Sequence, residues 1–243
     1  MTHSKDKTYL VTGVNSGLGK YLHRNLPGSL GLTRSNREHI LDRCEKIENL
    51  VILHCAYNSK RDVQNYSEYL DDNVFLTMEL LSLPHTRFVY FSSVDVYGVL
   101  TPYSFLKRAV GDLVATMADD YLILKLPAIL GPDMRKNSLV RILDSEGPLT
   151  LSSASSFNYV LQSDILTMVA GATATTKVGE YDFVSATNVT LEQIAARYNK
   201  EIDFGEFTYE TNLSQVLVEN NIHPHKERTS LETIELFLEG KND

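Results

Sequence analysis

Three side chains in the middle of the sequence have the types and spacing of an acid–base centre. Ser93 ends an apolar run that begins at Phe88, and Tyr103 and Lys107 follow at the start of a segment with helical spacing. Residues four apart share one helical face, so the Lys107 ammonium is expected beside the Tyr103 phenol. The charge is predicted to lower the Tyr103 pKa from about 10 by about 1–3 units. Tyr103 could then act as a general acid or base near neutral pH, with Ser93 hydrogen-bonding the same substrate oxygen.

A glycine-rich turn near the N-terminus has the composition of a phosphate-binding loop. It follows the apolar segment 9–11 and opens the next helical segment. Glycines let backbone amides approach a pyrophosphate, and the helix N-terminus offers unpaired N–H groups to the anion. Many glycine-rich turns only turn the chain, but this position, between the first strand and the first helix, favours a dinucleotide. The predicted cofactor contacts in the turn are Gly13, Asn15, Ser16, Gly17, Leu18 and Gly19.

The end of the second expected strand bears on which dinucleotide binds. An NAD site usually has an acidic residue there, on the ribose 2′-hydroxyl. This chain has Arg34 and Ser35 instead. Both could clasp a 2′-phosphate by charge-assisted hydrogen bonds, which favours NADP over NAD. The alternative is that Arg34 is an ordinary surface charge, and NAD stays possible.

The segments around these residues alternate between strand and helix patterns. Such alternation predicts an α/β fold, a doubly wound parallel sheet of about seven strands with helices on both faces. The sequence places six of the strands at 9–11, 30–33, 50–55, 88–91, 121–124 and 181–184. It places helices at 17–26, 69–83, 103–117 and 165–172.

The last 55 residues have a different pattern, with a helix opened by Thr190 and two more helical stretches at 213–220 and 230–238. We interpret them as a small cap on the sheet. The prediction is one Rossmann-type domain over 1–243, whose substrate-binding subdomain comes from about 131–163 and 187–243.

Composition limits the kind of protein further. The formal net charge is −8, the opposite sign to that of a non-specific nucleic-acid binder. No apolar run approaches the ~20 residues of a membrane span. Cys44 and Cys55 make no disulfide framework. We therefore expect a cytoplasmic protein with a small-molecule substrate and no nucleic-acid or membrane partner.

Taken together, the motifs resemble the short-chain dehydrogenase/reductase superfamily, and within it the extended, NAD-dependent epimerase/dehydratase-like branch. The resemblance covers nearly the whole chain. The matching segments are Thr12 to Gly19, His54-Cys55-Ala56-Tyr57, Asn73-Val74, Ser92 to Gly98, Pro102-Tyr103 with Lys107, Leu126 to Pro132, and Phe157 to Asp164.

This resemblance implies roles for individual residues. Tyr103 would be the general acid/base, Lys107 its partner, and Ser93 the ligand of the substrate oxygen. Cofactor contacts would come from Ala56, Tyr57, Asn73, Tyr103, Lys107 and Pro127. A homodimer through the helices at 69–83 and 102–118 is also implied.

The sequence departs from the branch in ways that bear on the reaction. Only ten positions separate Ser93 from Tyr103, so the usual substrate-side loop is trimmed. The arginine that often grips a nucleotide-sugar diphosphate is missing near Phe157, and only half of the acid pair of sugar dehydratases is present, at Val94-Asp95. A different anion clamp would have to come from Arg135, Lys136, Arg141 or Arg228.

The function predicted is oxidation or reduction of a carbonyl or secondary alcohol, in a nucleotide sugar or similar polar metabolite. The alternatives are a nucleotide-sugar epimerase or dehydratase that retains its cofactor, and a cofactor-sensing regulator on the same fold. We expect a wide, open substrate cleft lined by Ser93, Tyr97, Tyr103, Pro127 and Phe157, with Phe157 offering a stacking face.

Two further features are interpreted as ordinary surface chemistry. His223 and His225 are more typical of surface residues than of a metal pair, and no metal is expected. Asp71 and Asp72 are expected to be solvated residues at a helix terminus.

Overall fold

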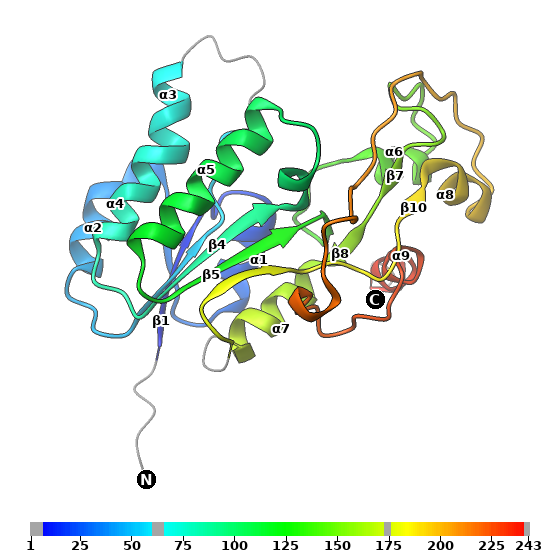
Figure 1. Cartoon of the computed structure of the whole chain (residues 1–243). Coiled ribbons are helices and arrows are strands. Elements are labelled where there is room, and N and C mark those ends of the chain that lie inside the picture. The colour runs from blue at the N-terminus through cyan, green and yellow to red at the C-terminus, as the bar shows by residue number, and fades with distance from the viewer. Residues whose placement is uncertain (1–6, 60–65, 173–175, 241–243) are drawn as a thin grey trace.

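A six-stranded parallel sheet forms the centre of the structure. The structure is a computed structural model, and it describes residues 7–59, 66–172 and 176–240. The strand order is β2-β1-β3-β4-β5-β9, and every neighbouring pair is parallel (Figure 1). The α/β doubly wound fold is therefore confirmed. The strands are β1 (Thr8–Thr12), β2 (Leu30–Leu32), β3 (Leu50–His54), β4 (Arg87–Ser93), β5 (Tyr121–Leu126) and β9 (Gly179–Asp182).

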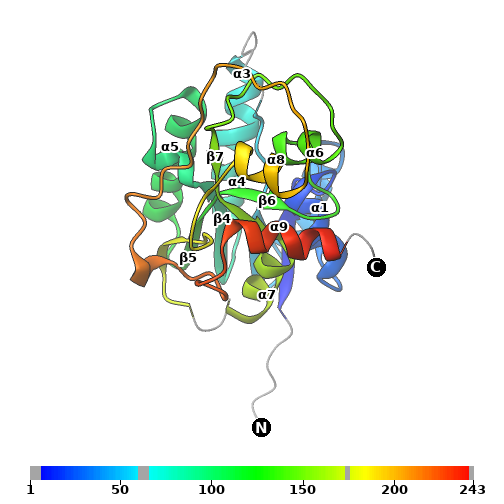
Figure 2. The same ribbon diagram turned by 90° about the vertical axis from the view of Figure 1, so that its right-hand side faces the viewer.

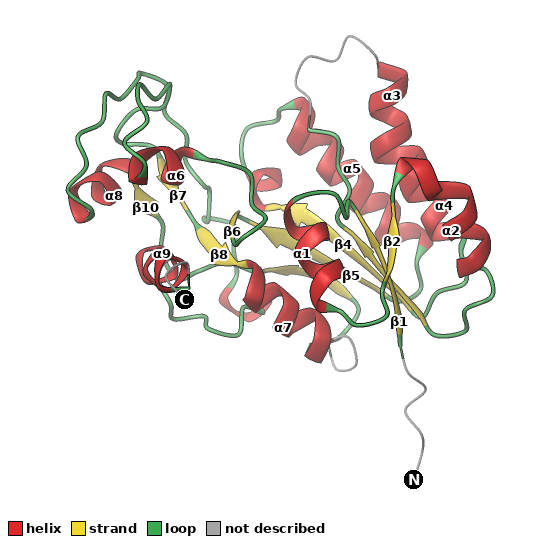
Figure 3. Ribbon diagram, turned by 180° about the vertical axis from the view of Figure 1, so that it is seen from behind, coloured by secondary structure: helices red, strands yellow, loops and turns green. Residues whose placement is uncertain are grey.

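Helices cover both faces of this sheet because its strands are apolar on both faces. Successive strand residues point to opposite sides, so Leu10 and Val11 enter different clusters of buried side chains. The helices α1 (Gly17–Asn25) and α7 (Gln162–Ala172) cover one face, seen from the front in Figure 3. The helices α2 (Arg37–Cys44), α4 (Leu76–Ser82) and α5 (Pro102–Met117) cover the other.

Among the residues that the structure describes, no strand of the main sheet lies outside β2. In the common dinucleotide-binding order 3-2-1-4-5-6, the third strand of the chain lies beyond the second. Here the third strand pairs with β1 instead, which gives the order 2-1-3-4-5-6. The reason is the link from Leu32 to Leu50, which holds the 3-10 turn η1 (Arg34–Asn36) and α2 but no further strand. The sheet thus has six strands against the expected seven.

The helix predicted over 69–83 is built from three pieces. It begins with α3 (Tyr66–Leu70), continues as the π-helical turn η2 (Asp71–Phe75) and ends with α4. The wide π turn changes which residues face the sheet, and such turns frequently occur at functional sites.

The later part of the chain forms a cap at the carboxyl ends of the strands (Figures 1 and 2). Two small sheets pair β6 (Ala128–Leu130) with β8 (Tyr159–Leu161) and β7 (Ser156–Phe157) with β10 (Val189–Thr190). They pack with α6 (Ser138–Leu143), α8 (Leu191–Arg197) and α9 (Ser230–Glu239) around a third apolar core.

The predicted helix at 213–220 is wrong except for the short 3-10 turn η4 (Val218–Asn220). Side chains there bond to other segments: Asn212 and Gln215 both donate to the carbonyl of Tyr97 at 3.4 Å. Nowhere in the described ranges does a helix have the length and apolar character needed to span a membrane.

Candidate active site

The glycine-rich turn between β1 and α1 has the backbone that a phosphate loop needs. Gly13 and Gly17 have φ of +71° and +57°, a region that favours glycine. A Cβ on Gly19 would lie 2.4 Å from the carbonyl oxygen of Thr12, whereas one on Gly17 would meet nothing within 4 Å. The turn therefore packs tightly on its own strand at Gly19 and leaves open space on the Cα side of Gly17, an arrangement that fits a dinucleotide pyrophosphate.

The other loop residues lie around this opening. Asn15 and Ser16 are exposed, and Leu18 is half-buried in the first turn of α1. The amide of Gly17 donates to the carbonyl of Asp133 at 2.9 Å, so the segment after β6 lies against the N-terminus of α1.

A buried chain of hydrogen bonds links the ends of β1 and β3. The Thr12 hydroxyl accepts from the Ala56 amide at 2.8 Å and lies 2.9 Å from Nδ1 of His54. Nε2 of His54 lies 2.9 Å from the Thr77 hydroxyl, which donates to the carbonyl of Asn73. Burial lowers the pKa of His54 to about 3, so the ring is neutral and its two nitrogens are fixed in donor and acceptor roles.

Asn73 fixes the loop that follows β3. Its side chain is buried in η2, accepts from the amide of Asn58 at 2.8 Å, and donates to the carbonyl of Asn58 at 3.2 Å. Asn73 thus supports the carboxyl edge between β1 and β3, where ligands of doubly wound sheets bind.

Ser93 and Tyr103 meet where β4 ends and α5 begins. A capping box between Thr101 and Ser104 starts α5, and Pro102 occupies its first position. The first turn is therefore fixed, and it brings the Tyr103 phenol close enough to Ser93 for that hydroxyl to favour the phenolate.

Lys107 lies one turn further along α5, buried beneath aromatic rings. Its ammonium donates to the carbonyl of Phe91 at 2.8 Å and lies 4.2 Å from the ring centroid of Tyr57 and 4.9 Å from that of Tyr90. Burial lowers the pKa of Lys107 to about 7. The Tyr57 ring also contacts Tyr103 edge to face, with centroids 5.2 Å apart.

The expected lowering of the Tyr103 pKa is wrong for this structure. Burial raises the pKa of Tyr103 to about 12, outweighing the opposing effect of the nearby Ser93 hydroxyl, and the charge of Asp95 raises it further. The Lys107 ammonium faces Phe91 and Tyr57 rather than the phenol, so the helical spacing alone does not supply the expected electrostatic effect.

Arg34 lies at the carboxyl end of β2, as the sequence predicts, but its guanidinium is already engaged. It binds both carboxylate oxygens of Asp72 and lies 3.3 Å from Glu68. The hydroxyl of Ser35 lies 3.0 Å from that of Thr33. The prediction that Asp72 is a solvated residue at a helix terminus is therefore wrong: its side chain is only 15% exposed and pairs with Arg34.

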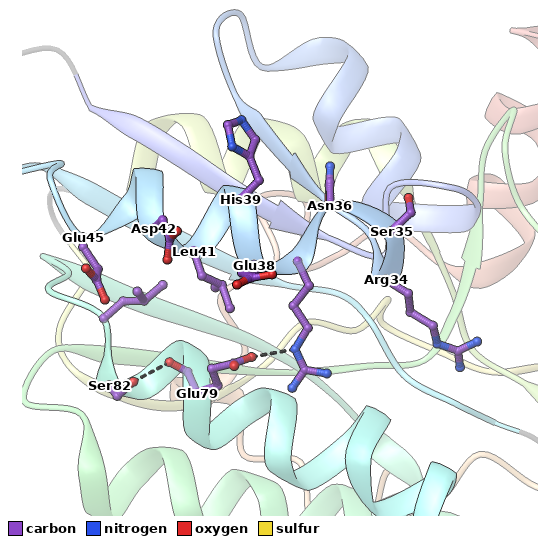
Figure 4. Close-up of a pocket in the computed structure, with 12 residues that line it drawn as sticks. Arg34, Ser35, Asn36, Glu38, His39, Leu41, Asp42, Glu45, Glu79 and Ser82 are labelled. Carbon is purple, nitrogen blue, oxygen red and sulfur yellow. Dashed lines mark hydrogen bonds and ion pairs between the residues drawn. The ribbon is translucent and has the colours of Figure 1, made fainter.

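A groove of about 560 Å³ runs from Arg34 and Ser35 between α2 and α4 (Figure 4). Four carboxylates line it, and Glu79 accepts from Arg37 at 2.6 Å. The lining residues are Arg34, Ser35, Asn36, Arg37, Glu38, His39, Leu41, Asp42, Glu45, Glu79, Ser82 and Leu83.

On the substrate side, two predicted lining residues contact other parts of the chain. The Tyr97 hydroxyl donates to Asp182 of β9 at 2.9 Å. The Phe157 ring stacks on Tyr159 and on Tyr209, with a centroid distance of 4.8 Å to Tyr209. Two rings of the chain itself therefore already stack on the predicted platform. Pro127 lies half-buried between β5 and β6.

Sequence reasoning missed Tyr209, which spans from the cap to the site. Its hydroxyl donates to Asp95 at 2.6 Å, and Asp95 follows Ser93 by two residues. Nothing in the spacing around Tyr209 indicates this contact, which depends on how the cap folds back.

The four basic residues suggested as an anion clamp are engaged elsewhere. Their partners are the Ser59 hydroxyl for Arg135, Asp144 and Glu146 for Lys136, the Pro148 carbonyl for Arg141, and Asp164 for Arg228. His225 is exposed as expected, whereas His223 is buried with Nε2 3.4 Å from Asp164. Within the described ranges, no three or more His, Cys, Asp or Glu residues are grouped as a metal site.

The fold is shared with solved structures of nucleotide-sugar enzymes. MoeE5, crystallised with UDP-glucose and NAD, matches with a TM-score of 0.74 at 17% identity, over 98% of this chain and 100% of that one. The ADP-L-glycero-D-manno-heptose-6-epimerase of Helicobacter pylori matches with 0.74 at 16%, over 98% and 96%. The dTDP-4-dehydrorhamnose reductase of Bacillus anthracis, in complex with NADP, matches with 0.73 at 15%, over 96% and 99%.

A scan of family models and a search of curated protein sequences both give no match. At such low identities the structural likeness establishes the fold alone, which this chain shares with the three enzymes above.

Proposed function

We propose that this protein is an NAD(P)-dependent oxidoreductase that acts on a carbonyl or secondary alcohol of a nucleotide sugar or similar polar metabolite. The observation that carries the proposal is the proximity of Ser93 and Tyr103 at the carboxyl edge of the sheet, with Lys107 buried one turn away. The nucleotide-sugar ligands of MoeE5 suggest the substrate class.

The glycine turn, Ala56, Tyr57 and Asn73 would hold the dinucleotide along the edge between β1 and β3. When bound, the nicotinamide supplies or accepts the hydride. Arg34 and Ser35 would contact a 2′-phosphate, which makes NADP the proposed cofactor and NAD the alternative. The open space beside the Gly17 Cα and the close packing at Gly19 are the features that fit such a ligand.

Ser93 and Tyr103 would bind the reacting oxygen together. A phenol with a pKa raised to about 12 is protonated at neutral pH, so the empty site is prepared to donate a proton to an alkoxide that forms during reduction. Lys107, with a pKa lowered to about 7, exchanges its proton readily near neutrality and would help to restore the phenol. Tyr209 and Phe157 would form the wall facing the substrate.

The proposal extends to assembly and location. The outer faces of α3, η2, α4 and α5 carry exposed apolar side chains, which supports a homodimer through these helices: Tyr66, Leu70, Phe75, Met78, Phe105 and Met117. Both cysteines are free, which is consistent with a reducing cytoplasm.

The catalytic assignment is tested with Tyr103→Phe. The variant is expected to bind NADPH with unchanged affinity in calorimetry but to lose about 10²–10⁴-fold in turnover, the usual contribution of a positioned acid. Turnover is followed as NADPH consumption on a panel of 4-keto nucleotide sugars. An epimerase would instead purify with its cofactor retained and show no net consumption. Full activity in Tyr103→Phe would contradict the assignment.

A further inference from the structure

Arg34 is highly exposed, yet its hydrogen-bonding fork is occupied. Nε donates to one carboxylate oxygen of Asp72 at 3.1 Å, and a terminal nitrogen binds the other oxygen and lies 3.3 Å from Glu68. This is the bidentate geometry that an arginine uses for carboxylates and phosphates alike. A 2′-phosphate would have to compete with Asp72 for the same fork.

Asp72 is held firmly in this position. Its side chain is only 15% exposed, and one oxygen also accepts from the side-chain amide of Asn58 at 2.9 Å. Asn58 is in turn fixed through its backbone by Asn73. The π turn η2 therefore presents a fixed carboxylate opposite the carboxyl end of β2.

The topology explains why the carboxylate comes from so far along the chain. No described strand lies outside β2 in the main sheet, and the link from β2 to β3 contains only η1 and α2. The switch point between β1 and β3 is thus bordered by the end of β2 on one side and by α3 and η2 on the other. Arg34 and Asp72 face each other across it although 38 residues separate them in the sequence.

We propose that Asp72, assisted by Glu68, sets the choice between the 2′-phosphate of NADP and the 2′-hydroxyl of NAD. The inference rests on the proposed function, because it concerns the dinucleotide of the same site. A 2′-hydroxyl can donate to Asp72 while Arg34 stays paired, whereas a 2′-phosphate must displace the carboxylate and then lie beside it with like charge. Asp72 thus supplies the acid that β2 lacks, and it limits the preference for NADP that Arg34 and Ser35 would otherwise produce.

The test is calorimetric titration of NADP⁺ and NAD⁺ into the native protein and Asp72→Asn. The substitution keeps the shape and an oxygen acceptor for Asn58 but removes the charge. The ratio of NADP⁺ to NAD⁺ affinity is expected to rise about tenfold, the usual scale for one charged hydrogen bond. Adding Arg34→Ala to the variant should abolish the rise, because the freed guanidinium is what binds the phosphate.

Asp71→Asn is the matched control, since it removes one negative charge at the next position. Asp71 lies 3.1 Å from Arg37, and the control should leave the ratio nearly unchanged. If Asp72→Asn proves poorly folded by thermal denaturation, Glu68→Gln should give a smaller rise in the same direction.

An unchanged ratio in Asp72→Asn and Glu68→Gln, or an equal rise in Asp71→Asn, would overturn the inference while dinucleotide binding itself stands. Failure of the native protein to bind either dinucleotide would overturn the proposed function, and this inference with it. The two failures are therefore distinguishable.

Discussion

At the scale of single residues, the buried Lys107 ammonium makes the stability of the folded protein depend on pH. Burial lowers its pKa in the folded protein from 10.5 to about 7. Between these two values the unfolded chain binds a proton that the folded chain does not. The free energy of unfolding therefore rises with pH through this window, by at most about 1.4 kcal/mol per pH unit, and falls as pH drops toward 7.

Lys107→Met should remove this dependence. We expect the variant to be more stable than the native protein at pH 7, because an apolar side chain avoids the cost of burying a charge, and nearly equal above pH 10. Urea unfolding at several pH values measures this. Lys125→Met is the control: Glu180 and Tyr97 raise the pKa of Lys125, so its removal should leave the rise between pH 7 and 10 in place. A native protein whose stability is flat over this range would contradict the prediction.

The same residue scale shows how neighbours outside a motif change its chemistry. Tyr103 and Lys107 have the spacing expected, but Tyr57 and the carbonyl of Phe91 engage the ammonium. The phenol consequently has its pKa raised by burial rather than lowered by charge. Arg34 behaves similarly, since its partner Asp72 comes from a distant helix.

At the scale of elements, the contact between β1 and α1 depends on Gly19. A Cβ there would overlap the backbone carbonyls of Thr12 and Gly13, at 2.4 Å and 2.6 Å. Gly19→Ala must therefore push α1 away from the sheet and deform the phosphate loop.

We expect Gly19→Ala to lose about 1–3 kcal/mol of stability, the usual range for overpacking, and to weaken binding of NADP⁺ and NAD⁺ alike. Chemical denaturation and calorimetry measure the two effects. Gly171→Ala is the matched control: this helical glycine of α7 has nothing within 4 Å of the added Cβ, so the change should be neutral or slightly stabilising. Equal behaviour of the two variants would contradict the packing argument.

The elements also show where periodicity succeeds and fails. Apolar runs locate the strands of the main sheet to within a few residues, because strands covered on both faces must be apolar throughout. The π turn η2 escapes detection, since one extra residue per turn leaves the apolar spacing nearly helical. The small sheets of the cap escape as well, because strands of two or three residues carry almost no periodic signal.

At the scale of the whole molecule, the proposed dimer makes a direct prediction. Met78 of α4 and Phe105 of α5 are 42% and 56% exposed on the apolar outer face. Met78→Glu combined with Phe105→Glu should convert the dimer into a monomer, because the two new carboxylates would be buried in an apolar interface without cationic partners. Light scattering coupled to gel filtration measures the change. Leu236→Glu is the control, because Leu236 is also 42% exposed but lies on α9 of the cap. This variant should remain a dimer. A native protein that is monomeric at all concentrations would contradict the prediction.

The sequence by itself determined the α/β class, the strand–turn–helix around Gly13 and Gly17, and the positions of Ser93, Tyr103 and Lys107. These features are local: they depend on apolar periodicity, on glycine spacing and on residues a few positions apart. Their roles in binding and catalysis stay predictions until the experiments above are done.

Only the tertiary structure decided what surrounds these residues. The pairing of Arg34 with Asp72, the enclosure of Lys107 by Tyr57, and the bond from Tyr209 to Asp95 each join segments far apart in sequence. Such contacts depend on strand order and on how the cap folds back, which no local pattern encodes. The physical reason is that a pKa or an affinity depends on every charge and dipole within a few ångströms, whichever part of the chain supplies it.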